Sequence, residues 1–291
     1  MSQPTRFLRD PSVERLIATA LREDLGRGDV TTLRTVPARA WATAKLWSRE
    51  AGLAAGLPLL ARVFHRLDKR VRVQVKVAEG GRFKRNQLLA QLQGPARAIL
   101  SGERVALNLL QRLCGIATLT AAHVAEARKG SRTVQLLDTR KTTPGLRLLE
   151  KYAVACGGGT NHRLRLDDAV LIKDNHLKVA GSVAEAVRRA RGGGLAVEVE
   201  VETLAELGQA LAAGADTVLL DNFPLPRLRA AQAAVGAFNQ AKGRRVRTEA
   251  SGGVTLATLR AVAATGVDSV SVGALTHSVR ALDLSLEFLP Q

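Results

Sequence analysis

Three glutamates, Glu198, Glu200 and Glu202, alternate with valines over residues 197–202. Successive side chains of a β-strand point to opposite faces, so this spacing places all three carboxylates on one face. Carboxylates crowded on one face repel one another unless cations lie nearby. The stretch therefore predicts a site with a metal ion, or with lysine and arginine side chains from neighbouring strands. A solvated face on an edge strand is the alternative, and the regular repeat around this stretch favours a central strand.

Basic side chains follow two neighbouring strand-like runs. Arg140 and Lys141 end one run, Lys173 ends the next, and His162 and Arg163 lie between them, just after three consecutive glycines. Arginine binds carboxylate or phosphate through two parallel hydrogen bonds, and lysine acts as a point charge. The cluster predicts a substrate with several negative charges. His162 alone has an equally good interpretation as a hydrogen-bonded structural histidine.

Two glycine-containing loops predict a phosphate site. Each follows a strand-like run, and the first precedes Thr255 at a helix start. Backbone N–H groups at a helix N-terminus bind phosphate, and barrels often place this site after their last two strands. The loop residues are Ser251, Gly252 and Gly253 in the first loop and Val272, Gly273 and Ala274 in the second. Glycine pairs also occur for turn reasons, so the two loops together carry more weight than either alone.

A phosphorylated substrate beside carboxylates implies a divalent cation. Mg²⁺ is typically held by one or two carboxylates together with substrate phosphates, which fits Glu200 and Asp221, with contact largely through substrate and water. The sequence has no Gly-x₄-Gly-Lys-Ser/Thr loop, which disfavours an ordinary nucleoside triphosphatase. Cys114 and Cys156 lack zinc-like partner spacing, and we interpret both as buried small apolar residues.

Strand-like and helical patterns alternate through the second half of the chain. The strand-like runs are residues 134–139, 169–173, 196–201, 217–220, 246–250 and 269–272, and the helical patterns are 183–191, 204–213, 225–240 and 256–264. Such repeats indicate a parallel sheet with crossover helices. Polar or ionisable residues end all six runs, which favours a β/α barrel over an open sheet. Six runs fall short of eight, so the barrel is expected to be incomplete.

The first half is expected to form an α+β module. Helical spacing over residues 10–25 and 96–113 flanks strand-like runs at 41–47, 71–77 and 88–92. Strands clustered between helices are typical of this class. The module differs from the second half in charge as well, because residues 1–115 hold 21 basic and 9 acidic residues, and residues 116–291 hold 22 and 17.

The chain of 291 residues has a formal net charge of +17, which suggests a nucleic-acid partner at first sight. Aromatic residues make up only 3%, so stacking platforms are scarce, and no basic tract is present. We therefore expect no nucleic acid. No apolar run approaches the roughly 20 residues of a membrane span, and residues 1–10 lack a secretory signal. The expectation is a cytoplasmic protein without a membrane partner.

Several motifs resemble the quinolinate phosphoribosyltransferases, the carboxylating nicotinate-nucleotide pyrophosphorylases. They are residues 23–32, 108–118, 138–147 (DTRKTTPGLR), 156–163 (CGGGTNHR), 171–176 (LIKDNH), 198–202, 219–223, 249–253 (EASGG) and 273–278. The resemblance covers almost the whole chain in order. It implies transfer of phosphoribosyl from phosphoribosyl pyrophosphate to quinolinate with Mg²⁺, giving nicotinate mononucleotide, pyrophosphate and CO₂ on the de novo route to NAD.

The resemblance also implies an α/β architecture in two domains. An N-terminal α/β sandwich is expected over residues 1–115 and an incomplete, seven-stranded α/β barrel over 116–275, with the tail 276–291 packing back on the sandwich. A homodimer is expected, in which the partner subunit completes each active site. Assembly into a higher oligomer is left as an alternative.

The family's residue roles carry over onto matching positions. By resemblance, Arg140, His162 and Arg163 hold the two quinolinate carboxylates, and Arg104 reaches in from the other subunit. The remaining expected contacts are Thr139, Lys141 and Lys173 with the substrates, Glu200 and Asp221 with ribose hydroxyls and Mg²⁺, and the two glycine loops with the 5′-phosphate. Lys141, Glu200 and Asp221 are the expected catalytic residues, and no general acid or base is assigned.

The chain departs from the family pattern at two positions. Arg165 stands where the family usually has glycine, and Cys114 replaces a frequent serine. We assign Arg165 no role. Three alternatives stay open: a homologue of the same fold with another substrate, such as the molybdenum-transport-associated one, a basic nucleic-acid-binding protein, and a non-catalytic scaffold. The last would leave the carboxylates unexplained.

Overall fold

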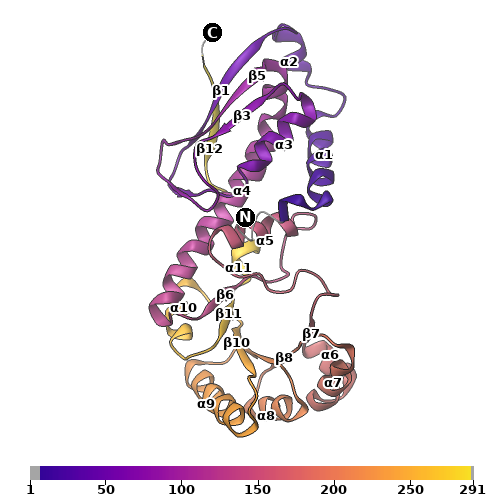
Figure 1. The fold of residues 1–291 in the computed structure, drawn as a ribbon, viewed down its shortest axis with the longest axis vertical. Helices are drawn as coiled ribbons and strands as arrows, with labels where there is room; N and C mark the ends of the chain where they lie inside the picture. Colours follow the sequence, from indigo (N-terminus) through magenta and orange to yellow (C-terminus); the bar gives the residue numbers. More distant parts are fainter. Residues whose placement is uncertain (1–6, 290–291) are drawn as a thin grey trace. The chain divides into compact units, whose positions relative to one another are not determined.

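A computed structural model describes residues 7–289 of the chain. The chain forms two compact units that interleave in sequence (Figure 1). The first combines residues 1–121, 142–158 and 275–291, and the second combines 122–141 and 159–274. The domains predicted from the sequence were the continuous ranges 1–115 and 116–275. The two units are defined by contacts between residues, and by this criterion the segment 142–158 belongs to the first unit.

The first unit contains an antiparallel four-stranded sheet in the order β12-β1-β5-β3. The bounds of its strands are Leu284–Phe288 for β12, Trp41–Ser48 for β1, Leu88–Pro95 for β5 and Arg72–Val75 for β3. A two-stranded sheet pairs β2, Gly52–Leu53, with β4, Arg82–Phe83. Because β12 pairs with β1, the C-terminal strand belongs to the sheet of the N-terminal module.

Helices accompany this sheet. They are α1 (Pro11–Leu25), α2 (Val30–Thr35), α3 (Pro58–Leu67), the first part of α4 (Ala96–Gly130), α5 (Arg147–Cys156) and most of α11 (Ala274–His277). The helix predicted at 10–25 is confirmed: Asp10 caps it by accepting a hydrogen bond from Ser12 N–H, and Val13, Ile17 and Leu21 are buried. Their spacing of four residues makes one apolar stripe that faces the core.

Helix α4 is longer and more apolar than the sequence suggested. It runs for 35 residues, against the 18 residues of the pattern at 96–113. One 18-residue window of α4 reaches a mean hydropathy of 1.3, so by length and composition this helix could cross a membrane. This corrects the expectation that no apolar stretch would pass that test. Within the window, 56% is buried inside the protein, as in the core helix of a globular protein.

The second unit is built on a parallel six-stranded sheet in the order β6-β11-β10-β9-β8-β7. Its strands are β6 (Gln135–Leu137), β7 (Val170–Ile172), β8 (Val197–Val201), β9 (Thr217–Asp221), β10 (Arg247–Ser251) and β11 (Ser269–Ser271). Each lies within, or one residue beyond, a predicted strand-like run. The sheet curves, and helices line its outer side (Figure 1).

The covering helices confirm the predicted repeat. They are α6 (Asp174–Ala180), α7 (Val183–Ala190), the short 3₁₀ turn Arg191–Gly193, α8 (Leu204–Ala213), α9 (Leu225–Lys242) and α10 (Leu256–Ala263). The side chains of Ser182, Thr203 and Thr255 cap α7, α8 and α10, as predicted. Gly214 ends α8 with φ of 95°, where a side chain would be strained.

The sheet has six strands in the described residues where seven were expected. Between β6 and β7 along the chain, Thr160 makes a single parallel bridge to Leu137. The three glycines just before Thr160 disfavour an extended strand, since glycine loses more conformational freedom on ordering than other residues. The two-unit α/β architecture with a parallel sheet is confirmed, and the seventh strand is reduced to this bridge.

Alternation along β8 separates the core from the site. Val197, Val199 and Val201 are buried, on the face that helices cover, and Glu198 and Glu200 point to the concave face. This confirms the prediction of a central strand with Glu198 and Glu200 on one face, whereas Glu202 lies beyond the end of β8 and is exposed. In register with it, Glu200 lies beside Leu219 of β9, and Asp221 of β9 lies beside Ser251 of β10.

Candidate active site

Asp138 anchors the segment that carries His162. Its carboxylate, fully buried just after β6, accepts a hydrogen bond from His162 N–H at 2.9 Å and another from the Asn161 side chain at 2.6 Å. Two donors compensate the cost of burying the charge. The segment after the three glycines is thereby fixed to the end of β6.

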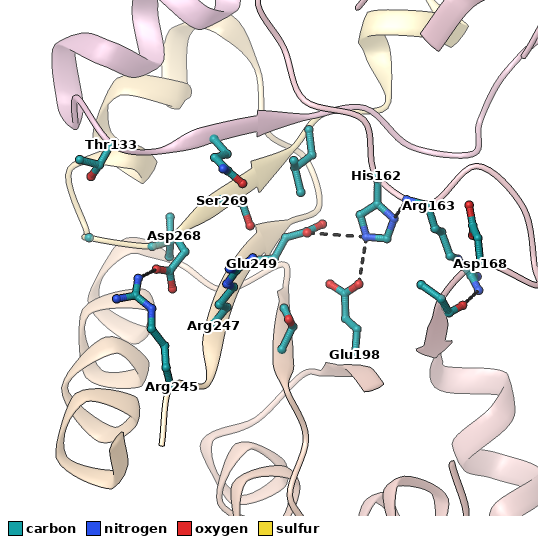
Figure 2. Close-up of a pocket in the computed structure, with 16 residues that line it drawn as sticks. Thr133, His162, Arg163, Asp168, Glu198, Arg245, Arg247, Glu249, Asp268 and Ser269 are labelled. Carbon is teal, nitrogen blue, oxygen red and sulfur yellow. Dashed lines mark hydrogen bonds and ion pairs between the residues drawn. The ribbon is translucent and has the colours of Figure 1, made fainter. Parts of the chain in front are cut away.

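The imidazole of His162 points onto the concave face of the sheet (Figure 2). Its Nδ1 accepts a hydrogen bond from Arg163 N–H at 2.8 Å, so Nδ1 carries no proton in this arrangement. Nε2 therefore holds the ring proton and donates it to Glu198 Oε2 at 3.0 Å. Glu249 Oε2 lies 3.7 Å from the same nitrogen. Both ring nitrogens of His162 are thus engaged inside the protein.

Glu249 of β10 is almost completely buried beside Glu198. Burial and then the neighbouring Glu198 charge raise the pKa of Glu249 to about 8, and His162 and a hydrogen bond with Ser271 act in the opposite direction. At neutral pH the Glu249 carboxyl is therefore mostly protonated. Such a neutral acid can donate a hydrogen bond to the Glu198 carboxylate.

His162, Glu198 and Glu249 have the spacing of a metal site, since their ligand atoms lie within 4.8 Å of one another. A metal on Nε2 would require the ring proton to sit on Nδ1. That proton would face the N–H of Arg163, which is itself a donor to Nδ1. The hydrogen bonding of the ring thus disfavours a metal ion here.

A second acidic pair lies at the carboxyl end of the strands. Lys173, which follows β7, forms an ion pair with Glu200 of β8. Burial and the charge of Glu200 raise the pKa of Asp221, and Lys173 and a hydrogen bond from Asn222 oppose the shift. Glu200 and Asp221 are therefore close enough to repel each other, and a cation would relieve that repulsion.

The first glycine loop has a conformation that a side chain would disrupt. Gly252 has a φ of 89°, and a Cβ there would lie 2.2 Å from Asn222 Oδ1. Asn222 itself has a positive φ of 53°, and its N–H donates to Ser251 O at 2.9 Å. Ser251, Gly252 and Gly253 line a hollow of about 350 Å³ beside the start of α10. Free N–H groups at a helix start suit a phosphate.

The second loop contributes less than expected. Val272 is buried, and its N–H donates to Leu137 O at 3.0 Å, so this amide belongs to the sheet and cannot hold a phosphate. Gly273 and Ala274 follow it, and α11 begins at Ala274. Of the predicted phosphate contacts, the structure supports the first loop best.

Two guanidinium groups lie together near His162. Arg163 donates to Ala169 O at 3.0 Å, and burial, with the charge of Arg140, lowers its pKa. Two like charges this close mark a place where an anion is stabilised. Thr139 Oγ1 accepts a hydrogen bond from Lys141 N–H at 3.1 Å, and Lys141 is exposed.

The predicted residues do not line one cavity. The largest of the cavities described, about 480 Å³, opens at the amino ends of the strands and includes His162 and Arg163 (Figure 2). Gln135, Thr217 and Arg247, each the first residue of its strand, line the same cavity. Glu200 lines a separate hollow of about 180 Å³ with Asp174, Glu202 and Glu206. Sequence reasoning placed every contact at the opposite, carboxyl rim.

Arg104 is not among these residues. It lies exposed on α4, in the first unit, whereas all other predicted site residues belong to the second. Sequence reasoning in turn missed the contact of Glu249 with Glu198 and His162. Period two along 247–251 places Glu249 on the same face as Ser251, and this pattern could have indicated it.

The fold and the site together define a two-domain α/β protein suited to a phosphorylated, multiply charged ligand. Two family profiles match the chain: quinolinate phosphoribosyl transferase, N-terminal domain, over residues 29–114, and the C-terminal domain of the same family over 116–287. The chain therefore belongs to the quinolinate phosphoribosyltransferase family, whose members are pentosyltransferase enzymes.

Individual relatives agree with this assignment. A protein of Mycobacterium leprae named nicotinate-nucleotide pyrophosphorylase (carboxylating) is 44% identical over 276 residues, covering 93% of this chain and 95% of the relative. A probable enzyme of the same name from Bacillus subtilis is 42% identical, covering 94% and 93%. The solved structure of the nicotinate-nucleotide pyrophosphorylase from Francisella tularensis superposes with a TM-score of 0.88 at 40% identity, covering 96% of each chain.

Proposed function

We propose that this chain transfers the phosphoribosyl group of phosphoribosyl pyrophosphate to quinolinate with decarboxylation, forming nicotinate mononucleotide, pyrophosphate and CO₂ for NAD biosynthesis. The observation that carries the proposal is the arrangement at the concave face of the second unit. Paired guanidinium groups, an acidic pair and a glycine loop come from the strands of one curved sheet and the segments that follow them, and their chemistry matches a dicarboxylate, a ribose and a phosphate.

Arg140 and Arg163 would hold the two quinolinate carboxylates. Burial and then the charge of Arg140 lower the pKa of Arg163, and a dianion bound between the two guanidinium groups would relieve their repulsion. Thr139 and the exposed Lys141 would add a hydroxyl and a mobile charge to the same substrate or to the phosphoribosyl donor. His162 was predicted as a third carboxylate ligand, but both its nitrogens are engaged within the protein, so its contribution is indirect.

Glu200 and Asp221 would bind the ribose hydroxyls and, with the substrate's own phosphates, Mg²⁺. Their oxygens are the ligand type that Mg²⁺ prefers, and the charge of Glu200 adds to burial in raising the pKa of Asp221. When bound, the ion would neutralise charge on the departing pyrophosphate. Glu200 and Asp221 would also stabilise positive charge developing on the ribose carbon, because fixed charges act strongly in a preorganised site.

The loop Ser251–Gly253 would hold the 5′-phosphate through its backbone N–H groups, while Lys173 would reach the donor from its place beside Glu200. Glycosyl transfer leaves the ring nitrogen positively charged. This pyridinium then accepts the electron pair released when the adjacent carboxylate leaves as CO₂, and a proton takes the place of the carboxylate. Binding two anions side by side is the main physical problem, and the basic groups of the site offset their repulsion.

The assembly that we propose is a cytoplasmic homodimer with a shared active site, without a nucleic-acid or membrane partner. Arg104, exposed on α4, would contact quinolinate in the partner's site. The resemblance of the motifs to the family supports this proposal.

The test of the proposed function is a comparison of two pyridine acids as substrates. With Mg²⁺ and phosphoribosyl pyrophosphate, the protein should form nicotinate mononucleotide from quinolinate and leave nicotinate unchanged. Turnover of nicotinate without turnover of quinolinate would contradict the substrate assignment, because the mononucleotide would then form without loss of CO₂.

A further inference from the structure

A chain of side-chain contacts runs beneath the anion site, from β10 through β8 to the segment 161–163. Glu249 lies against Glu198, Glu198 accepts the Nε2 proton of His162, and His162 Nδ1 accepts the N–H of Arg163. Figure 2 shows these side chains pointing toward one another from separate elements. The N–H of Arg163 donates to His162 and His162 donates to Glu198, so the contacts converge on the Glu198 carboxylate from both sides.

We propose that Glu249 and Glu198 are positioning residues, which hold His162 in one orientation and thereby fix the backbone that presents Arg163 to the anionic substrate. The inference rests on the proposed function for the identity of that substrate. Neither glutamate is assigned a contact with substrate, so neither is a catalytic residue in this account.

Burial makes the orientation of His162 well defined. The side chains of His162 and Glu198 are 12% and 13% exposed, and that of Glu249 is 3% exposed. A buried donor or acceptor left without its partner costs more than the hydrogen bond contributes, so the ring has few other orientations. Turning the ring would leave the N–H of Arg163 without its acceptor as well.

The segment that carries His162 and Arg163 is itself fixed at two points. Asp138 holds the backbone N–H of His162, and Arg163 reaches the carbonyl of Ala169 just before β7. The imidazole is therefore the link between the interior carboxylates and a segment tied to two strands. Loss of Glu249 would remove the support of Glu198 without touching either anchor, so the effect should appear at Arg163 and not throughout the sheet.

The test compares Glu249→Leu with Glu249→Gln. Leucine removes the hydrogen bonds, and we expect the KM for quinolinate to rise by about tenfold or more while the KM for phosphoribosyl pyrophosphate stays within about twofold. Glutamine can still donate to Glu198 and should restore most of the affinity. Thr248→Val is the matched control, because Thr248 is buried on the same strand with its side chain on the opposite face. It should leave both KM values unchanged.

Hydrogen exchange provides a readout that does not depend on turnover. In Glu249→Leu, the amide of Arg163 should exchange faster than in the unchanged protein, whereas the β10 amides should exchange as in Thr248→Val. Nitrogen-15 spectra of the unchanged protein should show His162 protonated on Nε2 only. A His162 ring protonated on Nδ1, or equal KM changes for both substrates with unchanged Arg163 exchange, would overturn the inference.

Failure of the proposed function would look different. A protein that does not turn over quinolinate, yet shows the Nε2-protonated ring and Glu249-dependent protection of Arg163, would retain the positioning network and lose only its assigned substrate.

Discussion

Lys173 pairs with Glu200 across neighbouring strands, the lysine just beyond β7 and the glutamate on β8. The lysine side chain is 46% exposed and the glutamate side chain 11%, so the pair lies partly in solvent near the carboxyl ends of the strands. A half-exposed pair contributes only about 0–1 kcal/mol to folding. Its value is therefore in holding the Glu200 side chain in place next to Asp221.

Glu200→Gln should accordingly separate activity from stability. Removing the charge that stabilises the developing cation should lower kcat by about 100-fold or more. The loss of one electrostatic group of this kind typically lowers kcat by roughly 10²- to 10³-fold. The midpoint of urea unfolding should shift little. Glu206→Gln, a carboxylate that caps α8 in the same hollow, is the control for general charge loss. A variant with full activity would contradict the role of Glu200.

Gly252→Ala should damage the phosphate loop. The positive φ disfavours alanine, and its Cβ would clash with Asn222. We expect the KM for phosphoribosyl pyrophosphate to rise by about tenfold or more, with a smaller change for quinolinate. Gly253→Ala is a useful comparison, because its φ is also positive but no atom lies within 4 Å of its Cβ. Equal effects of both variants would argue that backbone strain, and not the contact with Asn222, matters.

Arg112 and Glu150 form a partly buried ion pair inside the first unit, with the arginine side chain 29% exposed. Glu150 is fully buried, and Arg112 also donates to Thr143 and to the carbonyl of Thr276. Glu150→Leu would leave the guanidinium without its counter-charge, and we expect the free energy of unfolding to fall by about 3–5 kcal/mol. Urea denaturation measures this. Glu126→Leu, which removes an exposed pair with Lys129, should cost less than about 1 kcal/mol, and equal losses would contradict the account.

Glu249 predicts a characteristic dependence of stability on pH. Its pKa is raised in the folded protein to about 8 from an ordinary value near 4.5. The folded state therefore binds the proton more tightly, so this contribution is fully present below about pH 4.5 and is lost as pH rises through 8. Glu249→Gln, which cannot ionise, should be less sensitive to pH between these values. Identical pH profiles for both proteins would show that the buried carboxyl does not titrate this way.

Mixed dimers test the shared site. Arg104→Ala and Lys141→Ala would each inactivate a homodimer, but a mixed dimer would contain one site with neither change. Partial recovery of activity on mixing, up to about one quarter of the unmodified value for random exchange, is expected. No recovery in samples where exchange of subunits is demonstrated would contradict the proposal that Arg104 acts across the interface.

The sequence predicted the elements of the second unit well, because periodicity and capping residues are local signals. Thr203 and Gly214 marked both ends of α8 correctly. The alternation of Glu198 and Glu200 also identified the site face. Local patterns could not show that His162 turns toward Glu198 and Glu249, since that contact joins residues 36 and 87 positions apart and depends on which strands pair. The expected seventh strand is reduced to a bridge at Thr160, and local sequence patterns could not show this because it also depends on which segments pair.

The most direct measurement of the central claim is the stoichiometry of products from quinolinate labelled with carbon-13 in the carboxyl group next to the ring nitrogen. With phosphoribosyl pyrophosphate and Mg²⁺, the account predicts that labelled CO₂, pyrophosphate and nicotinate mononucleotide appear in equal amounts, and that none appears when the phosphoribosyl donor is omitted. Pyrophosphate release without labelled CO₂, or CO₂ release without the donor, would contradict it.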